Sequence, residues 1–305
     1  MLREHLLNKF VLIGGMPRSG TNLTRRIVGS HSDIAIPTAE FQFFRDYRQG
    51  KTIRQILANE KLQSWGVEFA DLYEQAPSQV YLAVLTRYAE KLGKTIAGEK
   101  TPRNEFYLDL AEEWLKGSQL KCIIMMRNPI DVCASYKFIP GAQGKNEKDA
   151  GLVYRSAHEW VRSITVALAK RYARPQNYFL LRYEDLVADP HAQTRALCEF
   201  LGVDFEESRM LSLADFSGHK DNTSFGQEQN LQQTYRIYRP ESRKQFLSND
   251  ETMVVRDVCG ELAWAVGYQD EIFMPADREA PGDGVATKKH QINKLRRWSR
   301  SLFPH

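Results

Sequence analysis

The apolar residues along the 305-residue chain fall into short continuous runs separated by longer stretches of helical spacing. Continuous apolar runs that end in glycine or in an Asn-Pro pair are typical of buried parallel strands. Runs of this kind predict strands at residues 10–15, 120–129 and 177–186, and a shorter strand at 95–102.

Helical spacing fills the intervals between these runs. The predicted helices span residues 21–30, 40–60, 78–92, 104–116, 129–138, 150–172, 190–201 and 250–267. Strands that alternate with helices predict an α/β fold of three layers, with a central parallel sheet flanked by helices. No repeat or linker interrupts the pattern before about residue 270, so we expect one domain over 1–270 and a flexible tail over 271–305.

Composition narrows the classes of function. With 42% hydrophobic residues and a net charge of +4, the chain is an ordinary globular protein whose charge is too small to indicate nucleic-acid binding. The four cysteines form no CxxC pair, so we expect no zinc site and no disulfide framework, only reduced thiols in the core. No apolar run approaches the roughly 20 residues of a membrane helix. The residues before the first strand are too few for a signal peptide, and we expect a cytoplasmic protein.

The sequence GGMPRSGTN, at 14–22, is close to a phosphate-binding loop that lacks its lysine. Gly15 and Gly20 have the G-x-x-x-x-G spacing, but Thr21 stands where ATP- and GTP-cleaving proteins have lysine. The positive charge lies inside the loop, at Arg18. Because backbone N–H groups at a helix start bind anions, the turn predicts an anion site that is not built for a β,γ-phosphate pair.

Three stretches, in chain order, resemble the sulfotransferase family, whose members use 3′-phosphoadenosine 5′-phosphosulfate (PAPS) as donor. They are GGMPRSGTN, MRNPIDVCASY and FLLRYEDLVADP, and GEKTPRN between the first two is also similar to the family. The likeness covers roughly residues 10 to 270 and is closer to the carbohydrate, tyrosyl-protein and bacterial branch than to the cytosolic phenol and steroid enzymes. It implies a P-loop-like fold, PAPS as co-substrate and no metal.

The resemblance assigns two sets of residues to the two ends of the donor. The set for the 5′ phosphate is Arg18, Ser19, Gly20, Thr21 and Asn22. The set for the 3′ phosphate is Arg127 and Ser135, which offer a rigid donor fork and a hydroxyl. The alternative for this pair is a surface ion pair and a helix serine bonded to its own backbone. Ser224 or Lys220, in a late loop that departs from the family's basic, glycine-rich version, is a further candidate for contact with the nucleotide.

The resemblance also implies a catalytic set of Glu40, Lys100 and Arg18. Lys100 matches a family lysine near the transferring sulfuryl group, and the alternative is a solvated lysine. The family branch uses a glutamate soon after the first helix as base, which points to Glu40 in PTAEFQFF, and the alternative is a charge at a helix start. No histidine occupies the 95–110 stretch, and His31 and His158 are the rival bases.

The RYEDL stretch is expected to be structural, with an ion pair between Arg182 and Glu184 that braces the cofactor pocket. The acceptor pocket is expected from segments 40–95 and 136–150 and from the late loop, which contain no readable code for the acceptor. Their aromatic residues fit a sugar, a lipid or an aromatic ring, and fit a core equally well: Phe41, Phe43, Phe44, Tyr47, Trp65, Tyr136 and Phe138. We expect a small-molecule, carbohydrate or lipid acceptor, and the sequence identifies neither it nor the oligomeric state.

The tail sequence KKHQINKLRRWSRSLF, at 288–303, has the pattern of a basic amphipathic helix. Contact with an anionic membrane is one interpretation, and a solvated tail or one docked on its own domain is the favoured one. Two alternatives to sulfuryl transfer stay open. One is a P-loop kinase or NTPase, which the missing lysine disfavours, and the other is a non-catalytic nucleotide-binding protein of the same fold.

Overall fold

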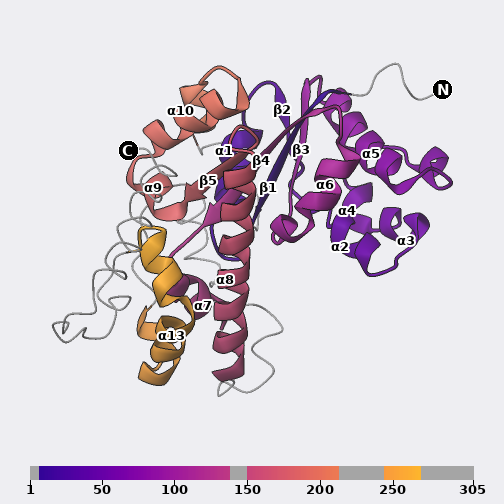
Figure 1. The fold of residues 1–305 in the computed structure, drawn as a ribbon. Helices are drawn as coiled ribbons and strands as arrows, with labels where there is room; N and C mark the ends of the chain where they lie inside the picture. Colours follow the sequence, from indigo (N-terminus) through magenta and orange to yellow (C-terminus); the bar gives the residue numbers. More distant parts are fainter. Residues whose placement is uncertain (1–6, 138–149, 213–243, 269–305) are drawn as a thin grey trace. The chain divides into compact units, whose positions relative to one another are not determined.

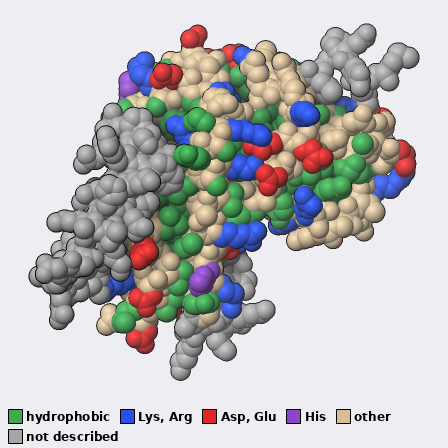
Figure 2. All heavy atoms as spheres, in the orientation of Figure 1, with side chains coloured by type: hydrophobic (Ala, Val, Ile, Leu, Met, Phe, Trp, Pro, Cys, Tyr) green, Lys and Arg blue, Asp and Glu red, His purple; other side chains and the backbone are tan. Residues whose placement is uncertain are grey.

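The computed structural model describes residues 7–137, 150–212 and 244–268, and the other residues are drawn in grey (Figure 1, Figure 2). These residues form two compact units, and each is described by itself. The first unit contains residues 7–126 and 166–212, and the second contains 127–137, 150–165 and 244–268. The expected single domain over 1–270 stays a prediction.

A parallel sheet of five strands forms the centre of the first unit (Figure 1). The strands are β1 (Lys9–Gly15), β2 (Ile34–Ala35), β3 (Ile96–Lys100), β4 (Gln119–Met126) and β5 (Tyr178–Arg182), in the order β2-β3-β1-β4-β5. The chain leaves β1 towards one side of the sheet and later crosses to β4 on the other side. Because open α/β sheets bind ligands where the strand order reverses, beyond the carboxyl ends of the strands, the end of β1 is the expected place for a site.

Helices cover the sheet of the first unit. They are α1 (Thr21–Gly29), α2 (Phe43–Arg48), α3 (Ile53–Leu57), α4 (Glu60–Gln63), α5 (Pro77–Lys91), α6 (Leu108–Trp114), α9 (Tyr183–Ala188), α10 (Pro190–Leu201) and α11 (Glu207–Met210), with the 3₁₀ turns η1 (Ala70–Leu72) and η2 (Asn104–Tyr107). The long helix α8 (Ala150–Ala173) begins in the second unit and ends in the first.

The two faces of the sheet pack against different helices. On one face, Val11 and Ile13 of β1 join a buried cluster with Ile27 of α1 and Leu197 of α10. On the other face, Tyr178 of β5 donates its hydroxyl to Glu112 of α6. Since helices lie on both faces, the predicted three-layer α/β fold with a central parallel sheet is confirmed.

The second unit is helical in its described residues. It contains α7 (Pro129–Tyr136), the first part of α8, η4 (Lys244–Phe246) and α13 (Asn249–Ala265). The start of α7 follows from its sequence, because Pro129 is the first helical residue and the side chain of Asn128 accepts the N–H of Ile130 at 2.9 Å. An ion pair of 3.0 Å between Lys137 Nζ and Glu251 Oε2 joins the end of α7 to α13.

Two predicted elements are wrong in extent. The single helix predicted at 40–60 is three short helices, because Gly50 takes a left-handed φ of 83° and Thr52 begins α3 with a capping box. The strand predicted at 177–186 ends at Arg182, and the chain turns into α9 at Tyr183.

Core positions were predicted for all four cysteines, and all four are buried, free thiols. Burial raises the pKa of each thiol, to about 12 for Cys133 and about 11 for Cys198, and it raises those of Cys122 and Cys259 further. Within the described ranges, no helix is long and apolar enough to cross a membrane.

Candidate functional site

The turn between β1 and α1 has the backbone geometry of an anion-binding loop. Gly20 is the N-cap residue of α1, with φ 103° and ψ 11°, and Arg18 has a left-handed φ of 75°. The turn is tight, since Ser19 donates both its N–H and its hydroxyl to the carbonyl of Met16, at 3.2 and 2.6 Å. Glycine has no side chain that could cap the first-turn N–H groups of α1. The predicted 5′-phosphate residues therefore lie together at a helix start that suits an anion.

Close packing explains both glycines of the G-x-x-x-x-G spacing. A Cβ at Gly15 would lie 2.4 Å from the carbonyl oxygen of Met125 on β4. A Cβ at Gly20 would lie 2.5 Å from Cδ2 of Tyr183. Both φ angles are positive, at 117° and 103°, so a side chain would also be strained. The tyrosine of RYEDL thus packs directly against the loop.

Glu105 is a site residue that the sequence analysis missed. Its Oε2 accepts the N–H of Gly15 at 2.7 Å, and the carbonyl of Gly15 accepts the N–H of Arg103 at 3.0 Å. Both backbone groups of Gly15 are therefore held by the segment that follows β3. Glu105 is 1% exposed, but no hydrophobic periodicity in the sequence around it indicates that it is buried.

Glu40 and Lys100 meet at the carboxyl end of β3. Lys100 Nζ lies 2.7 Å from Glu40 Oε1, although the two residues are 60 positions apart. The side chain of Lys100 is 2% exposed and that of Glu40 is 28% exposed, so Lys100 is not the solvated lysine of the alternative interpretation. Glu40 precedes Gln42, the N-cap residue of α2, and lies outside the helix. The structure thus pairs two of the three predicted catalytic residues.

Backbone strain concentrates in the segments that carry the predicted catalytic residues. In the described part of the chain, the non-glycine residues with positive φ are Arg18 at 75°, Gln42 at 56° and Arg103 at 73°. Gln42 follows Glu40 by two positions, and Arg103 follows Lys100 by three. Left-handed backbone costs on the order of 1–3 kcal/mol per residue and collects at functional sites.

In the second unit, Arg127 and Ser135 are both buried, at 5% and 0% exposed. A guanidinium nitrogen of Arg127 lies 3.7 Å from Asp131 Oδ2, and its carbonyl accepts the indole N–H of Trp160 at 2.9 Å. The Ser135 hydroxyl donates to the carbonyl of Asp131 at 2.7 Å, which is the backbone bond of the alternative interpretation. Ser135 would have to rotate its hydroxyl to donate to a phosphate.

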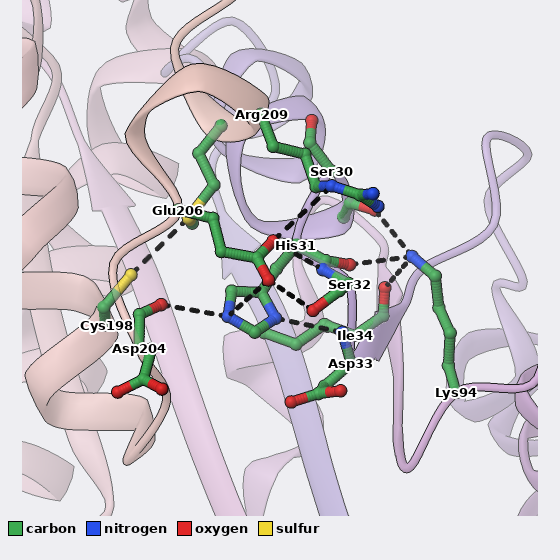
Figure 3. A network of polar contacts seen from close by, with 12 residues as sticks. Ser30, His31, Ser32, Asp33, Ile34, Lys94, Cys198, Asp204, Glu206 and Arg209 are labelled. Atoms are coloured by element: carbon green, nitrogen blue, oxygen red, sulfur yellow. Dashed lines mark hydrogen bonds and ion pairs between the residues drawn. The ribbon is translucent and has the colours of Figure 1, made fainter.

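The two rival histidines lie in different units and have different surroundings. His31 Nδ1 accepts the N–H of Asp33 at 3.0 Å, and Nε2 lies 3.0 Å from the carbonyl of Asp204 (Figure 3). His31 precedes β2, so it lies at the amino-terminal edge of the sheet, and Lys94 and Glu206 complete a structural network around it. His158 is exposed on α8 and its ring contacts that of Tyr154, with centroids 4.3 Å apart.

The aromatic residues offered for an acceptor pocket are largely core. Phe41, Phe43, Phe44 and Trp65 are at most 5% exposed. Their rings contact each other or the rings of Tyr81 and Trp114 in one cluster, to which α2 contributes Phe43 and Phe44. Tyr47 joins this cluster against Trp114, and Tyr136 in the second unit is buried.

In the RYEDL stretch, β5 ends at Arg182 and α9 begins at Tyr183. The ion pair expected between Arg182 and Glu184 stays a prediction. Arg182 Nε lies 3.7 Å from Asp185 Oδ2. The direct contact with the loop is made by Tyr183 at Gly20.

Some predicted residues lie outside the described part of the chain. They are Ser224, Lys220, Phe138 and the basic tail at 288–303. Within that part, no group of three or more His, Cys, Asp or Glu residues could hold a metal ion.

Comparison with known proteins agrees with the motifs. A family model described as the sulfotransferase family matches residues 11–207. The chain is 23% identical to the nodulation protein NoeE of Sinorhizobium fredii (strain NBRC 101917 / NGR234), over 93% of this chain and 72% of that protein. An uncharacterized protein of Aquifex aeolicus (strain VF5) is 26% identical over 67% of this chain, but the match spans only 27% of that protein.

Two solved structures share the fold. The sulfotransferase domain of the Synechococcus PCC 7002 olefin synthase is 22% identical with a TM-score of 0.54, and the match covers 84% of this chain and 96% of that one. The sulfotransferase domain from the curacin biosynthetic pathway is 20% identical with a TM-score of 0.58, and the match covers 84% and 98%.

Proposed function

Because this chain belongs to the sulfotransferase family, we propose that it transfers the sulfuryl group of PAPS to a hydroxyl or amine of an acceptor and releases adenosine 3′,5′-bisphosphate. The observation that supports this most is the pairing of Glu40 with Lys100 at 2.7 Å. A carboxylate that can accept a proton and a buried ammonium that can neutralise a leaving group lie side by side at the carboxyl edge of the sheet.

The proposed reaction is an in-line displacement at sulfur. PAPS supplies an activated sulfuryl group on its 5′ phosphate. The acceptor oxygen or nitrogen forms a bond to sulfur as the bond from sulfur to the phosphate oxygen breaks, and that oxygen keeps the electron pair. Glu40 takes the proton of the acceptor. Lys100 and Arg18, with N–H groups of the loop, stabilise the charge that grows on the departing phosphate.

The loop residues fit the 5′ end of such a donor. The first turn of α1 presents its N–H groups, and Arg18 supplies one cation without a lysine aimed at a third phosphate. We propose Ser19, Gly20, Thr21 and Asn22 as the other ligands of the 5′ phosphate. Arg127 and Ser135 are proposed for the 3′ phosphate, with Ser135 giving up its bond to the carbonyl of Asp131.

The acceptor class stays a proposal of a small molecule, a carbohydrate or a lipid. The buried aromatic cluster around Phe41 and Trp65 belongs to the core, so it does not argue for an aromatic acceptor. A panel of hydroxyl and amine acceptors from all three classes is therefore the appropriate screen.

The test is incubation with ³⁵S-labelled PAPS and this acceptor panel, together with calorimetry of adenosine 3′,5′-bisphosphate. We expect a labelled product, and tighter binding of the 3′,5′-bisphosphate than of adenosine 5′-phosphate. Arg127→Ala should remove most of that preference, and Arg155→Ala, at an exposed arginine of α8, should keep it. Magnesium-dependent ATP turnover without bisphosphate binding would favour a kinase or NTPase instead. Tight bisphosphate binding without transfer to any acceptor would favour a non-catalytic protein.

A further inference from the structure

A series of hydrogen bonds links the proposed base, Glu40, to the segment Glu99–Thr101 at both ends. Thr101 donates its hydroxyl to Glu99 Oε2 at 2.7 Å and accepts the backbone N–H of Gln42 at 3.3 Å. The side-chain amide of Gln42 donates to Glu40 Oε2 at 3.0 Å. Lys100 donates to the other oxygen of Glu40 at 2.7 Å, and it lies between Glu99 and Thr101 in the sequence. This series of hydrogen bonds therefore starts and ends within residues 99–101.

Both oxygens of the Glu40 carboxylate are held from different directions by this arrangement. Lys100 contacts Oε1 and Gln42 contacts Oε2. These two contacts fix the orientation of the carboxylate.

Glu99 is a fixed anchor for the far end of the chain. It is 1% exposed, and Tyr81 donates its hydroxyl to Oε1 at 2.8 Å while Thr101 holds Oε2. Burial raises the pKa of Glu99, and the hydrogen bonds from Thr101 and Tyr81 act in the opposite direction. Two donors on a buried carboxyl group leave little freedom to the Thr101 hydroxyl, whose one hydrogen is used here.

The backbone of Gln42 is strained, and Thr101 holds it in this conformation. Gln42 has φ 56° and ψ 17°, a left-handed conformation that a non-glycine residue keeps only when its surroundings enforce it. The contact that its N–H makes with the Thr101 hydroxyl is one such constraint. The same residue presents its side-chain amide to Glu40, so a shift of the backbone at Gln42 would move the base.

We propose that Thr101, anchored by Glu99, is a positioning residue that sets the orientation of the Glu40 carboxylate through Gln42. This inference rests on the proposed function, because it assumes that Glu40 acts as the base. Thr101 touches neither donor nor acceptor in this scheme. Its loss should therefore lower the rate of transfer and leave the affinity for the nucleotide unchanged.

The experiment compares Thr101→Val, which keeps the shape and removes the hydroxyl, with Thr101→Ser, which keeps the hydroxyl. A matched control is Thr86→Val, since Thr86 on α5 is also buried and its hydroxyl has no hydrogen-bond partner among the described residues. The measurements are kcat and KM with ³⁵S-PAPS and the best acceptor of the panel, the Kd of the bisphosphate, and the midpoint of thermal unfolding.

We expect Thr101→Val to lower kcat by about 10- to 100-fold, because small displacements of a catalytic group have effects of this size. Its Kd for the bisphosphate should stay within about twofold of the wild-type value, Thr101→Ser should recover most of kcat, and Thr86→Val should match the wild type. An unchanged kcat in Thr101→Val, or an equal loss in Thr101→Ser, would overturn the inference while leaving the proposed function intact. A wild-type chain that neither binds bisphosphate nor transfers sulfuryl groups would overturn both.

Discussion

The ammonium of Lys100 lies 2.7 Å from the carboxylate of Glu40, and this contact joins the end of β3 to the loop before α2. The lysine is nearly inaccessible and the glutamate is partly open, at 2% and 28% exposed. A base that is to meet an acceptor needs such access, so the exposed fraction of Glu40 fits its proposed role.

Replacing the base tests this division of roles. Glu40→Gln keeps the size of the side chain and removes the proton acceptor, so we expect transfer to fall by about 10²- to 10⁴-fold. Binding of the bisphosphate should persist, because the loop and its N–H groups are unchanged. Glu74→Gln is the control, since Glu74 forms an exposed ion pair with Arg54 and its side chain is 83% exposed. Equal activity of the two variants would remove Glu40 from the mechanism.

The packing of Tyr183 on the loop predicts a specific effect of one methyl group. Gly20→Ala places its Cβ 2.5 Å from the Tyr183 ring at a φ of 103°, so the loop must move. Gly117→Ala is the matched control, because Gly117 has φ 94° and nothing within 4 Å of its Cβ. Each substitution should lower the free energy of unfolding by about 1 kcal/mol, because alanine is strained at a positive φ. Only Gly20→Ala should also lose bisphosphate affinity, measured by calorimetry, and equal affinities would show that the loop tolerates the displacement.

The carboxylate of Glu105 should matter as an acceptor rather than as a charge. Glu105→Ala leaves the buried N–H of Gly15 without its acceptor and should cost about 1–3 kcal/mol of stability in urea unfolding. Glu105→Gln offers a carbonyl oxygen to the same N–H and should cost less. If the glutamine variant is as unstable as the alanine variant, the negative charge is the important property of this residue.

The stability of the first unit should depend on pH through Asp46. Its side chain is 4% exposed and lies 2.9 Å from both Lys51 and Arg45. Burial favours the neutral acid, but the hydrogen bonds from Lys51 and Arg45 prevail and lower the pKa of Asp46 below its ordinary value of 3.8. Because the folded pKa is the lower one, this stabilisation is complete above the unfolded pKa and is lost as the pH falls through the folded pKa.

Asp46→Asn should therefore lose about 1–2 kcal/mol of unfolding free energy at pH 7, since its cationic partners are partly exposed. The difference from the wild type should shrink in acid, near pH 3. Urea unfolding at both values measures it, with Asp257→Asn on the exposed side of α13 as control. If the stability difference between the wild type and Asp46→Asn is the same at pH 7 and near pH 3, the contacts of Asp46 with Lys51 and Arg45 do not depend on its charge.

The sequence predicted the parts of the fold that depend on local pattern. The predicted strands β1, β3 and β4 formed where the sequence is largely buried: β3 is buried throughout, whereas β1 and β4 each begin with an exposed residue. The two-residue strand Ile34–Ala35 was missed, since two residues show no period. The break after α2 could have been read from Thr52 and Gln55, whose spacing is that of a capping box.

The candidate site was predictable only where a motif carried it. Arg18 and Gly20 could be identified from the loop spacing, and Glu40 and Lys100 from the family resemblance. The contact between Glu40 and Lys100 could not be predicted, because no local sequence rule links residues 60 positions apart. Glu105 and Glu99 are buried acids whose hydrogen-bond partners lie on distant segments, and the sequence alone does not distinguish a buried glutamate from an exposed one.

The four shielded thiols have a practical consequence. Cys122 and Cys198 belong to the first unit, and Cys133 and Cys259 to the second. An alkylating reagent reacts with thiolate, so each site can be modified only after the surrounding structure opens. Mass spectrometry of the native protein during timed alkylation would therefore record the opening of each unit separately, without any engineered cysteine.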